Sequence, residues 1–159
     1  MPARGGTDIR DDWHEICGDV RPGGRQGDDG MQHWQRSDTG AGVIALGATL
    51  AFTWAGGTLA LGAHPWWALK VGYLGTGIGV LVWLGLRALG ASGRVRLALA
   101  ATALLVAAVA TGVGKARFAA SFAEDALAGR FWFIGWIAVM AAAFAVMATL
   151  VGAILRRMS

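Results

Sequence analysis

The sequence predicts an all-α membrane protein, with four transmembrane helices in an antiparallel bundle and a disordered N-terminal arm. Hydrophobic residues make up 55% of the 159 positions and charged residues 15%, and the mean hydropathy is +0.51, above the usual range of soluble domains. The charges are also unevenly distributed. Residues 1–38 contain five Arg and eight Asp or Glu, whereas residues 39–159 contain nine Lys or Arg and two acids. The two parts of the chain therefore prefer different solvents.

The predicted arm covers residues 1–40, which are rich in Gly, Asp and Arg and have no apolar periodicity. Met31 begins a polar lead into the first apolar segment and is an alternative start of translation. The stretch DDWHEIC at residues 11–17 contains side chains that can ligate metals, but it lacks a second His or Cys at ligand spacing. We interpret this stretch as a chance grouping and expect no metal site in the arm.

Four apolar segments follow the arm, and each reaches the roughly 17–25 residues that a helix needs to cross a bilayer core of about 30 Å. They lie at about residues 41–63, 66–86, 97–114 and 131–155. The transmembrane domain is therefore expected at residues 41–157. A signal peptide is the alternative for the first segment, whose apolar run is longer than the roughly 7–15 residues typical of signals.

The distribution of cations predicts the orientation of the spans. Four spans place the arm, the 87–96 loop and the C-terminal tail on one side of the membrane, with ten Lys or Arg, and leave four on the other side. An excess of cations marks the cytoplasmic side, which favours an N-in/C-in topology. The composition, with twelve Arg, two Lys and abundant Ala and Gly, suggests a bacterial origin and hence the bacterial inner membrane. Residues 116–129 are expected to form a short amphipathic helix at the outer surface.

Lys70 lies within the second apolar segment, and an ionisable residue within a span is by default a functional hypothesis. It follows Trp66 by four residues, about 6 Å along a helix axis, so its apolar stem can carry the ammonium group back to the interface. We interpret Lys70 as an interfacial anchor. The alternative is a polar site that Lys70 forms with Tyr73 or with a carboxylate, for which Glu124 and Asp125 are the candidates.

Small residues and tryptophans indicate how the helices pack and where the interfaces lie. Gly75 and Gly79 form a GxxxG pair, to which Gly72 adds a further small position, and such pairs allow close approach of a neighbouring helix. We favour packing within one chain over a dimer seam. Tryptophans near the ends of spans mark the membrane interfaces. The predicted outer anchors are Trp66, Trp67, Trp132 and Trp136, together with Lys70.

Few residues in the spans suggest catalysis. No Asp, Glu or His occurs in the four segments, so a carboxylate proton relay or a bis-histidine haem site lacks its residues. Cys17 is the single cysteine, and the sequence contains no nucleophile–base pair or phosphate loop. We therefore expect no catalytic residues, no metal and no cofactor. The cations lie singly or in pairs, which does not suggest nucleic acid as a partner.

Residues 66–117 begin with two tryptophans and an early lysine, and continue through a glycine–arginine stretch and a basic turn into an Ala/Leu-rich helix. In this pattern they resemble part of small bacterial membrane proteins of the SirB and copper-resistance-D type. The positions that carry the resemblance are Trp66, Trp67, Lys70, Gly85, Arg87 and Arg96. The resemblance implies a similar helix topology. It does not extend to copper or haem binding, because the chain has no histidine within its spans.

The function that these observations favour is non-catalytic. We expect an accessory, assembly or scaffolding subunit of a larger membrane complex, in contact with lipid and with either a membrane-protein partner or further copies of itself. One alternative is a small oligomeric permease that uses threonine hydroxyls and Lys70. A second alternative is a membrane anchor associated with a quinone or a pigment.

Overall fold

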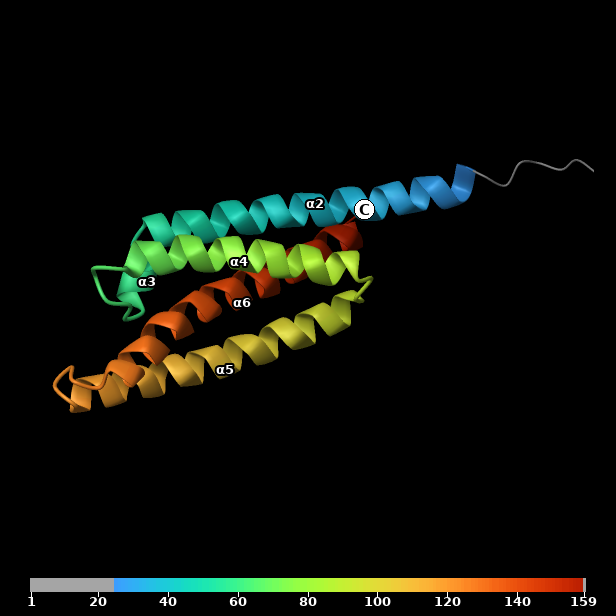
Figure 1. Ribbon diagram of the computed structural model, residues 1–159. Coiled ribbons are helices and arrows are strands. Elements are labelled where there is room, and N and C mark those ends of the chain that lie inside the picture. The colour runs from blue at the N-terminus through green and yellow to red at the C-terminus, as the bar shows by residue number, and fades with distance from the viewer. Residues whose placement is uncertain (1–24, 159) are drawn as a thin grey trace, which may run out of the picture. The chain divides into compact units, whose positions relative to one another are not determined.

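The computed structural model describes residues 25–158, and all regular structure in that range is helical (Figure 1). The helices are α2 (Arg25–Trp54), α3 (Gly57–Ala60), α4 (Ala68–Ala88), α5 (Gly93–Ala120) and α6 (Ala126–Met158). The chain divides into two units, Met1–Trp34 and Gln35–Ser159, and the contacts reported below all lie within the second. For the described residues, the prediction of an all-helical chain is confirmed.

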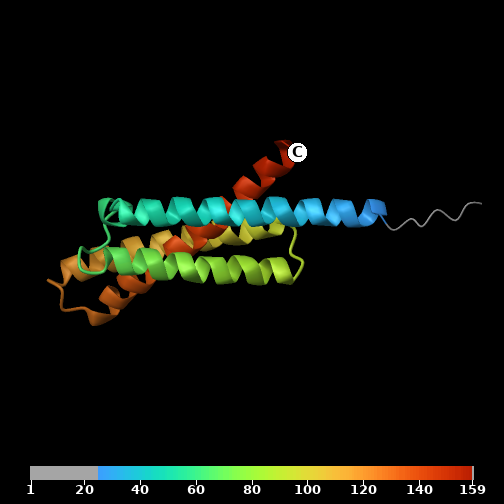
Figure 2. The ribbon, with the colours of Figure 1, turned by 90° about the horizontal axis from the view of Figure 1, so that it is seen from above.

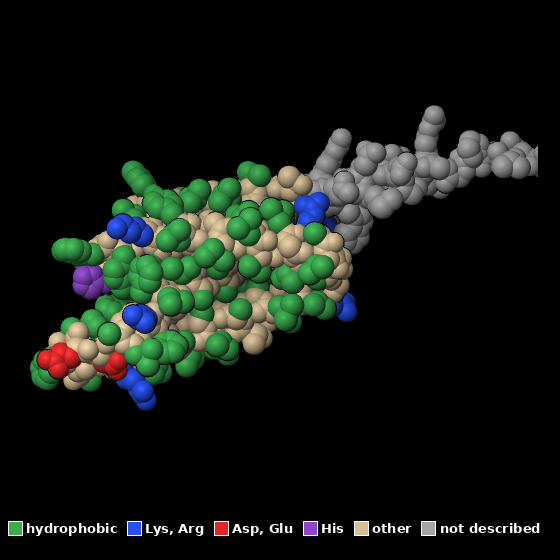
Figure 3. Space-filling view, viewed as in Figure 1, with side chains coloured by type: hydrophobic (Ala, Val, Ile, Leu, Met, Phe, Trp, Pro, Cys, Tyr) green, Lys and Arg blue, Asp and Glu red, His purple; other side chains and the backbone are tan. Residues whose placement is uncertain are grey.

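In the part of the chain that the structure describes, three helices are long and apolar enough to cross a membrane, namely α4, α5 and α6. Two of them extend past the predicted apolar segments at both ends, since α5 contains residues 97–114 and α6 contains residues 131–155. Figure 3 shows apolar side chains over the middle of the visible face and charged side chains toward its two ends. This arrangement is consistent with a membrane protein.

The first predicted span, residues 41–63, is not a single helix. α2 ends at Trp54, and Gly56 takes a left-handed conformation with φ of 80° before the single turn of α3. Only glycine adopts this conformation without steric cost. The prediction of an unbroken helix followed by a turn at residues 64–65 is therefore wrong, because the chain reverses over residues 55–67.

Residues 25–40 belong to α2, although their composition predicts part of a disordered arm. A physical reason is that no proline occurs between Pro22 and Pro65, so the helix can continue from its apolar half into the polar sequence before it. Residues 1–24, which include the DDWHEIC stretch, lie outside the described residues. Translation from Met31 stays a prediction.

The predicted interfacial helix at residues 116–129 is also divided. Its first residues complete α5 and its last residues begin α6, with a turn over residues 121–125. The Ala123 amide donates to the Phe118 carbonyl at 3.0 Å, and Phe122 and Ala123 both have positive φ, at 53° and 70°. This geometry resembles the left-handed ending of many helices, here without the usual glycine.

α6 packs against both α4 and α5 and lies between them in Figure 1, while Figure 2 shows it inclined to α2. The inner face of α2 bears small side chains at every fourth position: Ala41, Ala45, Thr49 and Thr53. Phe144 of α6, only 1% exposed, meets Trp83 of α4 edge-on with 6.3 Å between ring centroids. Ala45 and Ala100 join the same cluster, so four helices share one apolar core.

Candidate functional site

Asp38 of α2 lies between two arginines that come from α5 and α6. Arg96 Nη2 donates to Asp38 Oδ2 at 3.3 Å, and Arg156 Nη1 donates to Asp38 Oδ1. The side chains of Asp38 and Arg96 are only 13% and 9% exposed. Each carboxylate oxygen therefore has its own guanidinium, and the contacts join three helices. We call Asp38, Arg96 and Arg156 the charge clamp.

Local sequence places each member of the charge clamp on an inner helix face. Asp38 precedes the small side chains of α2, and Arg96 lies one turn before the buried Ala100. Gly152 provides space beside Arg156, because a β-carbon at this glycine would lie 3.2 Å from both Asp38 Oδ1 and Arg156 Nη1. Ser92 caps the start of α5 by accepting from the Val95 amide at 3.4 Å.

The charge clamp contains two permanent positive charges and one carboxylate. Arg96 Nε is buried and has no hydrogen-bond partner among the described residues. A buried guanidinium that lost its carboxylate would be costly, since a charge away from water needs a partner. Because both oxygens of Asp38 accept from guanidinium groups, the contacts suit a structural cross-link between helices.

Aromatic rings gather at the opposite ends of α5 and α6. Trp67 lies 5.2 Å from both Trp132 and Phe133, measured between ring centroids, and Phe118 lies 5.7 Å from Trp132. His64 stacks on Trp67 at 6.0 Å. We call these five residues the aromatic cluster. It brings together two of the tryptophans that the sequence marks as interfacial anchors, Trp67 and Trp132.

The other predicted anchors differ in their surroundings. Trp66 is 86% exposed, and Lys70 is exposed within the first turn of α4. Trp136, in contrast, is only 6% exposed and packs with Ala68 and Val71. A buried position suits helix packing, whereas an interfacial anchor would lie at the surface.

Lys70 and Tyr73, the predicted polar site, are one turn apart on α4 and both exposed. Among the contacts described for residues 38–158, none joins these two side chains. Lys70 likewise has no carboxylate within 4.0 Å in that range. The structure thus brings the pair near each other without forming a closed site.

The predicted packing glycines face two neighbouring helices. A β-carbon at Gly75 would lie 2.6 Å from the Ile137 carbonyl oxygen, and one at Gly79 would lie 2.6 Å from the Ala141 carbonyl oxygen, both on α6. Gly72 faces Thr53 of α2 at similarly close range. These approaches leave no room for a side chain, so all three glycines lie at interfaces within this chain.

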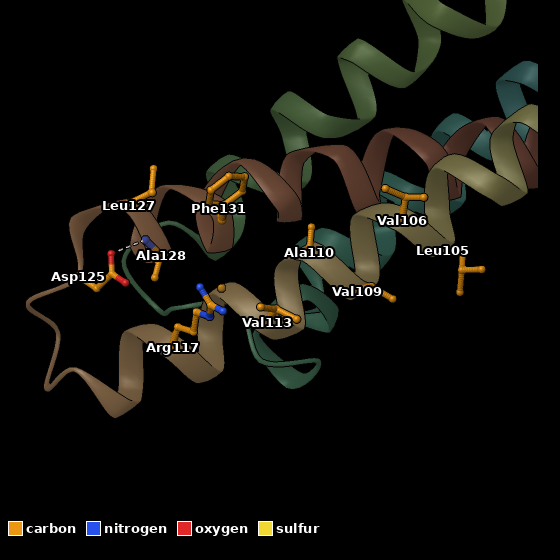
Figure 4. Close-up of a pocket in the computed structure, with 11 residues that line it drawn as sticks. Leu105, Val106, Val109, Ala110, Val113, Arg117, Asp125, Leu127, Ala128 and Phe131 are labelled. Atoms are coloured by element: carbon orange, nitrogen blue, oxygen red, sulfur yellow. Dashed lines mark hydrogen bonds between the residues drawn. The ribbon is translucent and has the colours of Figure 1, made fainter.

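α5 and α6 enclose an apolar trough near the 121–125 turn (Figure 4). One part of the trough measures about 570 Å³ and an adjoining part about 490 Å³. The two parts share Val106, Ala110, Leu127 and Phe131. Arg117 and Asp125 line the first part and Arg130 the second. In Figure 4 Arg117 extends from α5 toward the start of α6. We call this feature the α5–α6 trough.

Sequence reasoning missed the charge clamp, because Asp38 was assigned to the disordered arm. One usable signal was present, since the predicted topology places Asp38, Arg96 and Arg156 on the same side of the membrane. No comparable signal in the sequence indicates the α5–α6 trough, because the shape of the trough depends on how α5 and α6 are placed relative to each other. Among the side chains of residues 38–158, no three His, Cys, Asp or Glu group so that they could hold a metal ion.

Comparisons of the chain with protein-family models, with curated proteins and with solved structures find no match. The functional interpretation therefore depends on the residues and contacts described above.

Proposed function

We propose that this protein is a non-catalytic subunit of a larger membrane assembly, with four spans in an antiparallel bundle, in the bacterial inner membrane. The observation that carries the proposal is an exposed pair of small residues on α5, Ala108 and Gly112, which share their face with Ala101 and with the large, exposed Leu105. Ala101, Ala108 and Gly112 are exposed there, and a β-carbon at Gly112 would meet nothing within 4 Å. Small residues at such spacing allow a partner helix to approach closely.

The first span of the proposed bundle combines α2 and α3. The apolar part of α2, residues 41–54, rises about 21 Å at 1.5 Å per residue, which is less than a bilayer core of about 30 Å. Residues 38–40 of the same helix would lie at the inner interface, and residues 55–63 at the outer one, where the chain reverses. Non-helical backbone is tolerated at membrane depth when protein covers it. The Thr58 hydroxyl supports this arrangement, because it donates to the Ala68 carbonyl at 3.0 Å and ties α3 to α4.

Contacts along the helices support alternating directions. Gly42, in the middle of α2, lies beside Trp83 near the end of α4, and Thr53 at the end of α2 lies beside Gly72 near the start of α4. In the same way, Gly114 near the end of α5 lies beside Trp132 near the start of α6, and Gly93 at the start of α5 lies beside Arg156 near the end of α6. Each pair of contacts is expected for helices that cross a bilayer in opposite directions.

The cations support an N-in/C-in orientation. Arg96 and Arg156 of the charge clamp, with Arg94 and Arg157, lie at the ends of α5 and α6 that the positive-inside rule assigns to the cytoplasm. The aromatic cluster lies at the other ends of these helices, where tryptophans suit an interface. The resemblance to SirB and copper-resistance-D proteins suggests the same kind of topology and adds no chemical role.

Site-specific photocrosslinking in native membranes tests the proposed role. A crosslinker at Ala108 should capture one defined protein, either a different subunit or a second copy of this chain. A crosslinker at Leu81, 70% exposed on α4, is the matched control and should capture mainly lipid. Equal capture at both positions, or no protein product at Ala108, would contradict a docking role for this face of α5.

A packing variant provides a second test. Gly112→Leu should abolish the Ala108 crosslink while leaving the purified chain folded, because Gly112 has open space around it. Gly114→Leu is the contrasting variant. A β-carbon at Gly114 would lie 2.8 Å from the Trp132 amide nitrogen, so this change should destabilise the chain itself.

A further inference from the structure

The α5–α6 trough is almost wholly apolar along its length. Alanine, valine, leucine, isoleucine, phenylalanine and glycine make up its lining except for Arg117, Asp125 and Arg130. The three charged residues belong to the ends of the helices next to the 121–125 turn, as Figure 4 shows for Arg117 and Asp125. The trough is therefore amphipathic. Most of its length is apolar, and its end next to the 121–125 turn, which we call the mouth, is lined by charged side chains.

Two arginines and one carboxylate, that of Asp125, are the charged side chains that line the mouth, while Glu124 lies in the same turn outside the lining. Asp125 is engaged in capping α6, since its Oδ1 accepts from the Ala128 amide at 2.9 Å (Figure 4). Among side chains 38–158, neither Arg117 nor Arg130 has a carboxylate within 4.0 Å. Two guanidinium groups are thus available to bind an anion, and arginine binds phosphate oxygens through paired hydrogen bonds.

The size of the trough suits a short or narrow occupant. Its two parts, of about 570 and 490 Å³, would together accept fewer than three turns of a helix that fills about 400 Å³ per turn, whereas a membrane-spanning helix of about 20 residues has more than five turns. A hydrocarbon chain is much narrower and can lie along both connected parts. Basic pockets between membrane helices are also suited to anionic lipid head groups.

We propose that the α5–α6 trough binds one anionic phospholipid, with an acyl chain along the trough and the phosphate at the charged end, where Arg117 lines one part and Arg130 the adjoining part. This inference rests on the membrane placement proposed above. It does not depend on the role as a subunit, because the docking face at Ala108 and Gly112 is outside the lining of the trough.

Native mass spectrometry of the purified full-length protein tests the proposal. The probes are dioleoyl phosphatidylglycerol, dioleoyl phosphatidylcholine and glycerol phosphate, each added to delipidated protein in mild detergent. We expect one phosphatidylglycerol to be retained at about tenfold lower concentration than phosphatidylcholine, since the zwitterionic choline head group weakens the contact with arginine. Glycerol phosphate, which lacks acyl chains, should not be retained.

Two variants test the charged mouth and the apolar part of the trough separately. The double variant Arg117→Gln, Arg130→Gln should bind phosphatidylglycerol about tenfold more weakly, since it loses the charge-assisted hydrogen bonds. Both side chains are exposed, so the fold should survive. Ala110→Trp should fill the apolar part of the trough and prevent the acyl chain from binding there. The matched controls, Arg94→Gln and Leu81→Trp, change exposed residues away from the trough and should bind as wild type.

Two lipid-binding results and one crosslinking result would each contradict the proposal. Equal retention of the two phospholipids, or unchanged phosphatidylglycerol binding by the double arginine variant, would exclude a specific anionic site even if Ala110→Trp failed to fold. Capture of a protein by a photocrosslinker at Ala110 would assign the trough to a partner helix. Recovery of the chain in the soluble fraction would instead contradict the membrane placement itself, so the two failures are distinguishable.

Discussion

Arg96 of α5 donates a hydrogen bond to Asp38 of α2 at 3.3 Å, although 58 residues separate the two in the sequence. Arg156 of α6 binds the other oxygen of the same carboxylate across 118 residues. Contacts between residues so far apart in the sequence stabilise the arrangement of the helices relative to one another and not any single helix. The stability of the bundle should therefore depend on Asp38 more strongly than on any exposed charge.

Substitution of Asp38 tests this dependence. Asp38→Asn should lower the free energy of unfolding by about 3–5 kcal/mol, because it leaves two largely buried guanidinium groups without their carboxylate. Thermal unfolding of the detergent-solubilised protein measures the loss as a fall in Tm. Arg96→Gln should act similarly, whereas Arg94→Gln, at an exposed position two residues away, should leave Tm unchanged. A wild-type Tm for Asp38→Asn would show that the charge clamp does not stabilise the fold.

The glycines of α4 allow a comparison within one helix. Gly79→Leu should cost at least about 1–3 kcal/mol, because its side chain would overlap the backbone of α6 at Ala141. Gly77→Leu places the same side chain where nothing lies within 4 Å of the β-carbon. That variant should be neutral or stabilising by less than about 1 kcal/mol, since leucine is the better helix former. Size-exclusion profiles and Tm should separate the two; similar behaviour would argue against the α4–α6 contact.

Two equally buried threonines should differ in how much stability the protein loses when each is replaced by valine. Thr58 and Thr53 are both fully buried, but only Thr58 has a hydrogen-bond partner, the Ala68 carbonyl. Thr58→Val should cost about 0.5–1.5 kcal/mol, because it removes the hydrogen bond from the Thr58 hydroxyl to the Ala68 carbonyl. Thr53→Val removes a hydroxyl that has no partner among the described residues, so it should be neutral or stabilising. Equal changes in Tm would contradict this difference.

Cysteine accessibility tests the proposed topology. In a Cys17→Ser background, Leu61→Cys and Ala123→Cys should react with a membrane-impermeant maleimide from the same side. Leu89→Cys should react only from the opposite side. Leu61 and Leu89 are 66% and 83% exposed, so burial within the protein should not limit labelling. Labelling of positions 61 and 123 from different sides would mean that α2 and α3 do not together cross the membrane.

Lys70 distinguishes an anchor from a transport residue. Because its side chain is exposed at the first turn of α4, Lys70→Ala should leave Tm unchanged. In liposomes loaded with small ions or metabolites, the variant and the wild type should give the same flux. A flux present in the wild type and lost in Lys70→Ala would favour the permease alternative.

The sequence predicted the apolar helices well because their signal is local. Runs of apolar residues identified α4, α5 and α6 to within a few residues at most ends, and the extensions of α5 and α6 continue past the apolar runs. The break after Trp54 was missed, although the Gly56–Gly57 pair is a turn signal. Averaged hydropathy does not detect such a break, because threonine and glycine remain compatible with an apolar span.

The candidate sites were harder to predict, because they depend on contacts between distant parts of the chain. Asp38 is one of eight acids within residues 1–38, and nothing local separates it from the others. Its role becomes visible only when α5 and α6 bring two arginines to it. For Trp136, the position near the start of a span indicates its depth in the membrane, whereas its burial depends on the packing of α4 on α6, which the sequence alone does not show.

The two ends of α5 are held by contacts of different physical kinds. At Arg96 the attachment is an ion pair, which loss of the Asp38 carboxylate would remove. At Phe118 the attachment is ring packing against Trp132. No single substitution at one end therefore loosens both ends. If the contact with Asp38 is lost, the contact with Trp132 still holds the other end of α5. We therefore expect α5 to separate from the bundle locally, at its Arg96 end, and not along its whole length.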